Sequence, residues 1–208
     1  MGSFNITNRS FTLLGHNGSG KSTIIKYLLG FYPNPSSHKF LNTLSKNLPI
    51  LDISSVGYVP EQVTLAEEMS GEEYVDLVLK LKNISTTSPN FFDKVSLRMD
   101  NKIPIKHYSK GMKQKLLLAL LLIHNPKNII LDEPTSGLDI FMTKEIEDLL
   151  LELNVNHNLI ISTHSVSLAH KLGNEILVLK NGEVFFNGFL ENEKEIEEKL
   201  LESMGICV

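Results

Sequence analysis

A glycine-rich stretch near the start of the chain constrains the fold most strongly. It fits the phosphate-binding loop pattern G-x-x-x-x-G-K-[ST] and reads Gly15-His16-Asn17-Gly18-Ser19-Gly20-Lys21-Ser22-Thr23. The apolar run Phe11–Leu14 before it predicts a buried strand, and the apolar spacing after it predicts a helix from Ser22 to Leu29. A strand, a glycine-rich turn and a helix in this order surround an anion with backbone N–H groups. The stretch therefore predicts an α/β protein that binds phosphate groups.

The residue types in this loop suit a nucleotide. The glycines let the backbone approach phosphate oxygens closely. Lys21 can place its ammonium on the β- and γ-phosphate oxygens, and Ser22 can offer its hydroxyl to Mg²⁺. The predicted nucleotide-binding residues are Asn17, Gly18, Ser19, Gly20, Lys21, Ser22 and Thr23. The alternative is a glycine-rich turn with a solvated lysine, but the complete pattern between a strand and a helix favours the phosphate site.

Composition excludes several other classes of protein. The chain has 208 residues, enough for one hydrophobic core. Its net charge of −4 does not favour nucleic acid, so no nucleic-acid partner is expected. The only cysteine is Cys207, which rules out a disulfide within one chain and fits a reducing compartment. The longest apolar runs, Leu116–Ile123 and Asn128–Leu131, are far shorter than the roughly 20 residues of a membrane span. We therefore expect a soluble, cytoplasmic chain.

The rest of the chain alternates between short apolar strands and amphipathic helices. Ser70 followed by Glu73 predicts a capping box, Asp139 can cap a second helix, and Asn181-Gly182 predicts a tight hairpin turn. Strands are predicted at Val56–Val59, Asn128–Leu131 and Leu159–Thr163, and a hairpin at Glu175–Phe186. Besides the capped helices, others are predicted at Phe91–Met99, Met112–His124 and Glu191–Ser203.

A pair of carboxylates follows one of the predicted strands. Asp132 and Glu133 come directly after the run Asn128–Leu131, and a phosphate-binding loop needs such a partner. Asp132 stands in the Walker B position, where it would hold Mg²⁺ through water. Glu133 is the best candidate for the general base that polarises the attacking water. The alternative is that these residues simply end a strand, but the upstream loop favours the catalytic interpretation.

Further motifs follow in a characteristic order. They are Gln62, Ser109-Lys110-Gly111-Met112, Ser136-Gly137-Leu138-Asp139 and His164. Together with the phosphate loop and Asp132-Glu133, they resemble the nucleotide-binding subunits of ATP-binding cassette (ABC) transporters from about Phe4 to Gly188. The resemblance implies one ABC ATPase domain over residues 1–208, with a P-loop NTPase core and a mainly parallel, RecA-like sheet. It also implies a β-hairpin portion and an inserted α-helical subdomain over approximately residues 66–115.

The resemblance assigns roles to individual residues. Glu133, His164 and Gln62 would be catalytic, with His164 contacting the γ-phosphate and keeping Glu133 and the water in register. Ser22, Gln62 and Asp132 would hold Mg²⁺. Ser109 and Gly111 would bind the ATP that another subunit holds. Asp139 would lie at a dimer seam, and capping of a helix is an equally good interpretation that is compatible with it.

The chain departs from the family pattern in two places. The signature, usually Leu-Ser-Gly-Gly-Gln, reads Tyr108-Ser109-Lys110-Gly111-Met112, which looks like the form in exporters of drugs, antibiotics or lantibiotics from Gram-positive bacteria. Lys110 either adds positive charge near the anion or points to solvent, and it can form a solvated helix face with Lys113 and Lys115. The aromatic residue that usually stacks on adenine is missing at its usual spacing, because Phe4 is too close to the loop and is expected in the core.

The resemblance implies an ATP- and Mg²⁺-dependent ATPase subunit that powers export of a drug, antibiotic or peptide through a separate membrane permease. A second ABC ATPase subunit, identical or different, would close head to tail on this one at the cytoplasmic face of the cell membrane. The alternatives are a non-transport ABC-type ATPase, a nucleotide-gated clamp with little turnover, and a P-loop kinase. A kinase would have no use for Gln62, Ser109 and His164. The transported substrate is not specified by this chain.

Overall fold

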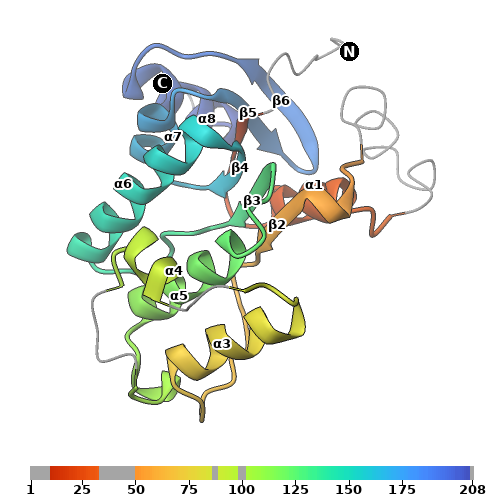
Figure 1. The fold of residues 1–208 in the computed structure, drawn as a ribbon. Coiled ribbons are helices and arrows are strands. Elements are labelled where there is room, and N and C mark those ends of the chain that lie inside the picture. Colours follow the sequence, from red (N-terminus) through yellow and green to blue (C-terminus); the bar gives the residue numbers. More distant parts are fainter. Residues whose placement is uncertain (1–9, 33–49, 86–88, 98–101, 207–208) are drawn as a thin grey trace.

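The computed structural model describes residues 10–32, 50–85, 89–97 and 102–206. Within these ranges the chain forms one sheet with helices on both faces (Figure 1). This confirms the predicted α/β class with a mainly parallel sheet. None of the described helices is long and apolar enough to cross a membrane. The expected core position of Phe4 lies outside the described residues.

The described sheet has the strand order β2-β3-β4-β1-β5-β6. All neighbouring pairs are parallel except β5 and β6, which form the predicted antiparallel hairpin. The order places β4 between β1, which leads into the glycine-rich loop, and β3, which leads into Asp132-Glu133. The strands are β1 (Phe11–Leu14), β2 (Val56–Val59), β3 (Asn128–Asp132), β4 (Asn158–Thr163), β5 (Glu175–Lys180) and β6 (Glu183–Gly188).

Helices cover both faces of the sheet. One face is covered by α1 (Lys21–Leu28), and the other by α5 (Lys110–Leu122), α6 (Ile140–Asn156) and α7 (Val166–Leu172). The C-terminal helix α8 (Glu193–Met204) packs against α7 and β5. Short 3-10 turns at Ile53–Ser55 and Ile105–His107 precede β2 and α5.

The central strands are buried on both faces because successive side chains point in opposite directions. In β3, Ile129 and Leu131 pack in the core cluster that contains residues of α5 and α6. Ile130 packs in the cluster that contains residues of α1. The strand β4 repeats this alternation. Near-continuous apolar runs are therefore tolerated, as expected for parallel strands between two helical layers.

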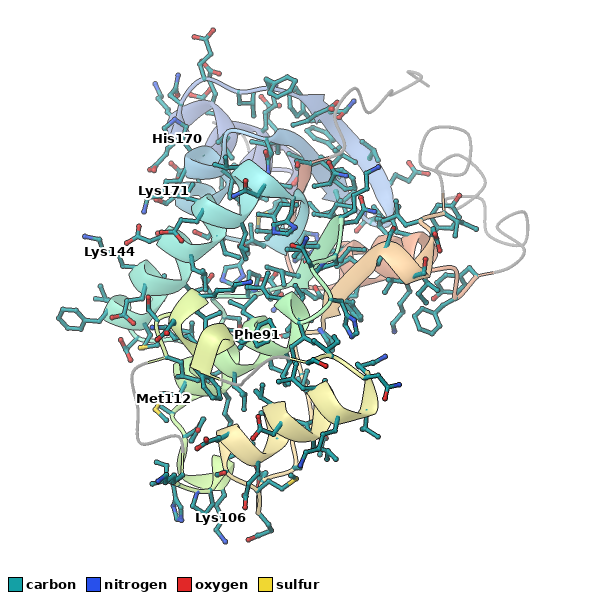
Figure 2. All side chains as sticks on the ribbon, viewed as in Figure 1. Phe91, Lys106, Met112, Lys144, His170 and Lys171 are labelled. Atoms are coloured by element: carbon teal, nitrogen blue, oxygen red, sulfur yellow. The ribbon has the colours of Figure 1, made fainter. Side chains whose placement is uncertain are left out.

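The helices α3 (Gly71–Leu81) and α4 (Pro89–Lys94) gather with α5 at one end of the molecule (Figure 1). Lys106 lies at this end, whereas His170 and Lys171 of α7 lie toward the opposite one (Figure 2). The predicted capping box begins α3, where Ser70 N–H donates to Glu73 Oε2 at 2.8 Å and Glu73 N–H donates to Ser70 Oγ at 3.2 Å. The hydrogen bond from the Ser70 backbone N–H, followed by the Ser70 side chain, lowers the pKa of the Glu73 carboxyl. The inserted subdomain over residues 66–115 remains a prediction.

The second helix of this segment differs from its predicted range. It spans Pro89–Lys94 rather than Phe91–Met99, so it begins two residues earlier and ends five residues earlier than predicted. Proline suits the first turn of a helix, where its missing N–H would have no partner anyway. The helix ends where Leu97 N–H turns back to the Phe92 carbonyl and Ser96 adopts a left-handed φ of 50°. The last two residues of the predicted range lie outside the described residues.

Candidate active site

The glycine-rich loop joins β1 to α1 at the carboxyl end of the sheet. Gly20 is the N-cap of α1 with a φ of 108°, and no described side chain caps that helix end. The first N–H groups of a helix have no intrahelical partner, so they are available to an anion. Gly18 has a φ of 81°, which an L side chain rarely adopts. The loop thus has the shape that phosphate binding requires.

The buried side chain of Lys21 connects this loop to the carboxylate pair. Its Nζ donates to the Gly15 carbonyl at 2.7 Å and lies 3.1 Å from Glu133 Oε1. The two side chains of this ion pair are only 7% and 8% exposed. Glu133 Oε1 accepts no aligned hydrogen bond from any described residue, so the pairing is mainly Coulombic. An incoming phosphate would meet an ammonium that is already held in place.

Glu133 has an unusual backbone conformation. Its φ is 50°, in the left-handed region, which costs a non-glycine residue on the order of 1 kcal/mol. The conformation is held by its N–H, which donates to the Ser162 carbonyl at 3.0 Å and to the Ser162 hydroxyl at 3.1 Å. His164 Nδ1 lies 2.9 Å from Glu133 Oε2. The buried carboxylate of Glu133 therefore lies between Lys21 and a histidine that is 62% exposed.

Asp132 is buried at the end of β3 and is held from β4. The Ser162 hydroxyl donates to Asp132 Oδ1, so one serine orients both carboxylate residues. Burial raises the pKa of the Tyr58 phenol, and the negative charge of Asp132 raises it further. Ser162 is not among the site residues predicted from the sequence. The available signal was a hydroxyl residue inside the apolar strand that precedes His164.

A cavity of about 310 Å³ lies between the loop and the carboxylates. It is lined by Asn17, Gly18, Ser19, Gly20, Lys21, Ser22, Thr23, Glu61, Asp132 and Glu133. The structure thus brings the predicted phosphate loop and the carboxylate pair together from distant parts of the chain. The Ser22 hydroxyl and the Asp132 carboxylate both line this cavity as hard oxygen donors, and this donor set fits Mg²⁺.

Other predicted residues lie outside this cavity. Gln62 is exposed, and its neighbour Glu61 lines the cavity instead, a residue that the sequence analysis did not assign. Ser109 and Gly111 do not line it either. Their predicted roles are compatible with an ATP molecule held by another subunit, and all of the assigned roles remain predictions.

The signature residues form the start of α5. Ser109 is the N-cap, with its Oγ accepting the Met112 N–H at 3.2 Å. Gly111 packs so closely on α6 that a Cβ there would lie 2.4 Å from Met142 Cε. A Cβ on Gly137 would lie 2.6 Å from Lys110 Nζ, so the Lys110 ammonium lies over the turn that follows Glu133. Lys110 is exposed to solvent, but its ammonium lies close to this turn. The structure therefore does not select either of the two alternatives, a charge beside the anion or a side chain that points to solvent.

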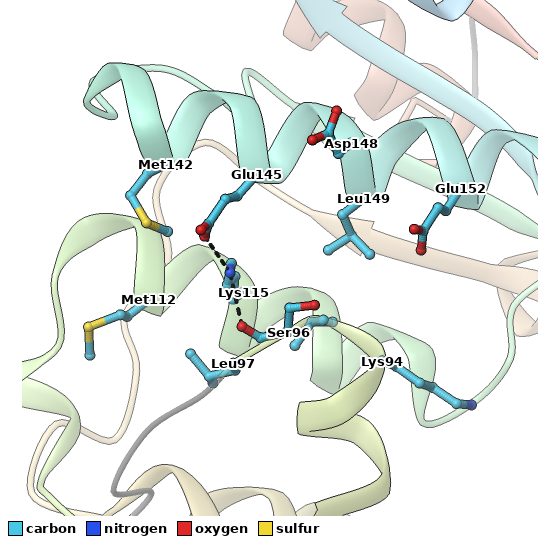
Figure 3. Close-up of a pocket in the computed structure, with 11 residues that line it drawn as sticks. Lys94, Ser96, Leu97, Met112, Lys115, Met142, Glu145, Asp148, Leu149 and Glu152 are labelled. Atoms are coloured by element: carbon cyan, nitrogen blue, oxygen red, sulfur yellow. Dashed lines mark hydrogen bonds and ion pairs between the residues drawn. The ribbon is translucent and has the colours of Figure 1, made fainter.

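The solvated helix face proposed for Lys110, Lys113 and Lys115 is wrong for Lys115. Its side chain is only 6% exposed and pairs with Glu145 Oε2 of α6 at 2.7 Å. Its Nζ also donates to the Ser96 carbonyl at 3.0 Å (Figure 3). The lysine lines a cavity of about 640 Å³ between α5 and α6, with Met112 and Met142 at one end (Figure 3). Helical position alone did not reveal this burial, because it depends on where α6 lies.

The fold and the site together define a P-loop NTPase. A parallel strand leads into the glycine-rich loop and α1, and a second parallel strand ends in the carboxylate pair. Comparison with protein families identifies a narrower class within these NTPases. The family model described as "ABC transporter" matches residues 3–136, more than half of the chain. The chain belongs to the ABC transporter family, and it is an ATP-binding domain of the ABC ATPase type.

Several known proteins are similar to this chain. The uncharacterized ABC transporter ATP-binding protein YxlF of Bacillus subtilis is 32% identical over 92% of this chain and 65% of its own length. The lantibiotic transport ATP-binding protein SrtF of Streptococcus pyogenes is 30% identical over 90% of this chain and 82% of its own length. The structure of cbiO1 from Clostridium perfringens, part of the ABC transporter complex cbiONQ, has a TM-score of 0.69 and 26% identity, covering 97% of this chain and 85% of that one. The chain spans only 21% and 10% of two eukaryotic relatives.

Proposed function

We propose that this chain binds ATP with Mg²⁺ in the cavity beside the glycine-rich loop and hydrolyses it to drive transport through a membrane permease. The observation that carries the proposal is the convergence of Lys21, Glu133 and His164. Glu133 Oε1 lies 3.1 Å from Lys21 Nζ, and Oε2 lies 2.9 Å from His164 Nδ1. A general base needs such orientation, and a terminal phosphate needs the cation beside it.

The chemistry follows from these positions. The loop N–H groups and Lys21 would hold the β- and γ-phosphates, which places the γ-phosphorus near Glu133. A water molecule attacks this phosphorus, Glu133 takes its proton, and the bond to the bridging oxygen of ADP breaks. His164 would hold Glu133 and the water in register. Ser22 and Asp132 would hold Mg²⁺, and Gln62 would complete its shell; the ion neutralises negative charge on the phosphates.

The proposal includes a second ABC ATPase subunit, identical or different. Ser109 and Gly111 lie at the N-terminus of α5, away from the cavity of their own chain. They would contact the ATP of the facing subunit, so that two chains close head to tail. The permease would dock where Gln62 is exposed, at the cytoplasmic face of the membrane. The proposed cargo is a drug, antibiotic or peptide, and export is favoured by the form of the signature. The similar protein SrtF is described as a lantibiotic transport protein, which favours a cargo of this kind.

The decisive test is the variant Glu133→Gln, which keeps the shape of the side chain but removes the base. We expect it to bind Mg-ATP like the wild type and to lose on the order of 10²-fold or more in turnover. Turnover close to that of the wild type would remove Glu133 from this role. If the wild type binds ATP without measurable turnover, the chain is a nucleotide-gated clamp.

The same variant tests the second subunit. Light scattering of Glu133→Gln should show an ATP-dependent change from monomer to dimer, because bound ATP then persists at the seam. A monomer at saturating Mg-ATP would contradict dimer closure by this chain alone. The same measurement with the permease present would then show whether the partner is needed.

A further inference from the structure

The turn of the C-terminal hairpin reaches the glycine-rich loop from the side opposite the carboxylates. The strand β5 continues beyond β1, because Leu14, the last residue of β1, pairs with Val178. The turn Asn181-Gly182 follows, with φ values of 49° and 81°. Gly182 N–H donates to the Ser19 carbonyl at 2.8 Å. A segment far along the chain therefore hydrogen-bonds directly to the loop backbone.

The two backbones are in close contact at this point. A Cβ on Gly20 would lie 3.1 Å from the Gly182 Cα. A Cβ on Gly15 would lie 3.1 Å from the Leu179 carbonyl oxygen. These short distances show that the hairpin backbone forms one wall of the loop, although the atom nearest to a Cβ on Gly15 is the loop's own Ser19 Oγ, at 2.4 Å. At Gly20 the nearest atom is in the hairpin, so a side chain at this position would press on the wall.

The hydrogen bond also orients a group on the phosphate side. The Ser19 carbonyl and the Gly20 N–H belong to one planar trans peptide, so they point in opposite directions. The hairpin and the carboxylates flank β1 on opposite sides, because β5 lies on one side of β1 and β4 with β3 on the other. A Ser19 carbonyl that is held toward Gly182 therefore directs the Gly20 N–H away from the hairpin and toward the cavity.

We propose that Gly182 is a positioning residue for nucleotide binding, which acts by fixing the peptide between Ser19 and Gly20. This inference rests on the proposed function, since the cavity must bind ATP. Without the hydrogen bond, the peptide can rotate and the Gly20 N–H loses its direction toward the phosphates. The side chain of Ser19 does not replace it, because its buried Oγ has no hydrogen-bond partner among the described residues.

The test compares Gly182→Pro with Gly173→Pro. Both glycines have positive φ and open space around a Cβ, and each donates one backbone hydrogen bond, Gly182 to Ser19 and Gly173 to the His170 carbonyl at 3.0 Å. Proline removes the N–H and the left-handed φ at either site, but Gly173 lies at the end of α7. We expect similar losses of thermal stability. Only Gly182→Pro should weaken Mg-ATP binding, by roughly tenfold or more, measured by isothermal titration calorimetry.

The outcomes separate this inference from the proposed function. A wild type that does not bind Mg-ATP overturns the function itself. A wild type that binds, with both variants losing equal affinity, overturns the role of Gly182. Gly182→Asn should keep wild-type affinity, because asparagine tolerates positive φ and retains the N–H. If the proline variants do not fold, Gly182→Ala and Gly173→Ala replace them, because alanine is strained at the positive φ of both positions. Only Gly182→Ala should then lose affinity for Mg-ATP, by about fivefold.

Discussion

At the scale of single residues, the active-site cluster depends on one serine that supports two carboxylates. Ser162 donates to Asp132, and its hydroxyl and carbonyl both accept the N–H of Glu133. Glu133 can therefore keep its left-handed backbone, which would otherwise relax. The serine does not line the cavity beside the glycine-rich loop, yet it sets the direction of the proposed base and of the proposed metal ligand.

Ser162→Ala tests this support. The variant leaves the buried Asp132 carboxylate without its hydroxyl donor, so we expect the free energy of unfolding to fall by about 1–3 kcal/mol. Urea denaturation measures the change. The control is Ser167→Ala, at a half-buried serine of α7, which should cost much less. Equal losses in the two variants would show that the Asp132 hydrogen bond contributes nothing specific.

At the scale of elements, the start of α5 is joined to α6 at two places. Gly111 allows the close approach of Met142, and Lys115 pairs with Glu145 one turn further along each helix. Because the signature residues begin α5, these contacts tie their position to the helix that follows Asp139. The Asp139 carboxylate caps that helix, as predicted, by accepting the Met142 N–H at 3.0 Å.

Lys115→Ala should disrupt this junction. The lysine is buried and binds both the Ser96 carbonyl and Glu145, so we expect a loss of about 2–4 kcal/mol in the free energy of unfolding. Lys113→Ala is the matched control on the same helix, since its pair with Glu67 is far more exposed, at 29% and 54%, and should be worth less than about 1 kcal/mol. Chemical denaturation of both variants gives the comparison. Losses of similar size would mean that the buried pair does not stabilise the junction.

At the scale of the whole molecule, the proposed site joins segments that are distant in sequence. Four segments meet at the carboxyl end of the sheet. They are the loop after β1, the carboxylates at the end of β3, the histidine after β4 and the turn after β5. The carboxyl ends of parallel strands are where open α/β sheets bind their ligands. A ligand in this cavity therefore contacts several parts of the fold at once and should stabilise the chain globally.

Thermal unfolding measures that coupling. Mg-ATP at about a hundredfold excess over its Kd should add about 2.7 kcal/mol, which corresponds to a rise in Tm of roughly 5–10 °C for a chain of this size. Lys21→Ala removes the buried ammonium and should abolish most of the rise. A rise that persists in Lys21→Ala would place the bound nucleotide elsewhere.

The sequence by itself determined the parts whose signals are local. The glycine-rich loop, the capping box at Ser70, the Asp139 cap and the Asn181-Gly182 turn each depend on residues a few positions apart. The core strands were also predictable, because burial between two helical layers requires continuous apolar runs. The end of α4 was not, since it depends on a left-handed Ser96 that the apolar periodicity does not show.

Only the tertiary structure decided which of these local features meet. The strand order places Ser162 beside Asp132 and Glu133, and it places Gly182 on the far side of the loop from them. It also buries Lys115, whereas Lys110 on the same helix is exposed. These contacts join residues far apart in sequence, and their energies depend on distance and burial in the folded chain. Residue type and spacing along the sequence specify neither quantity.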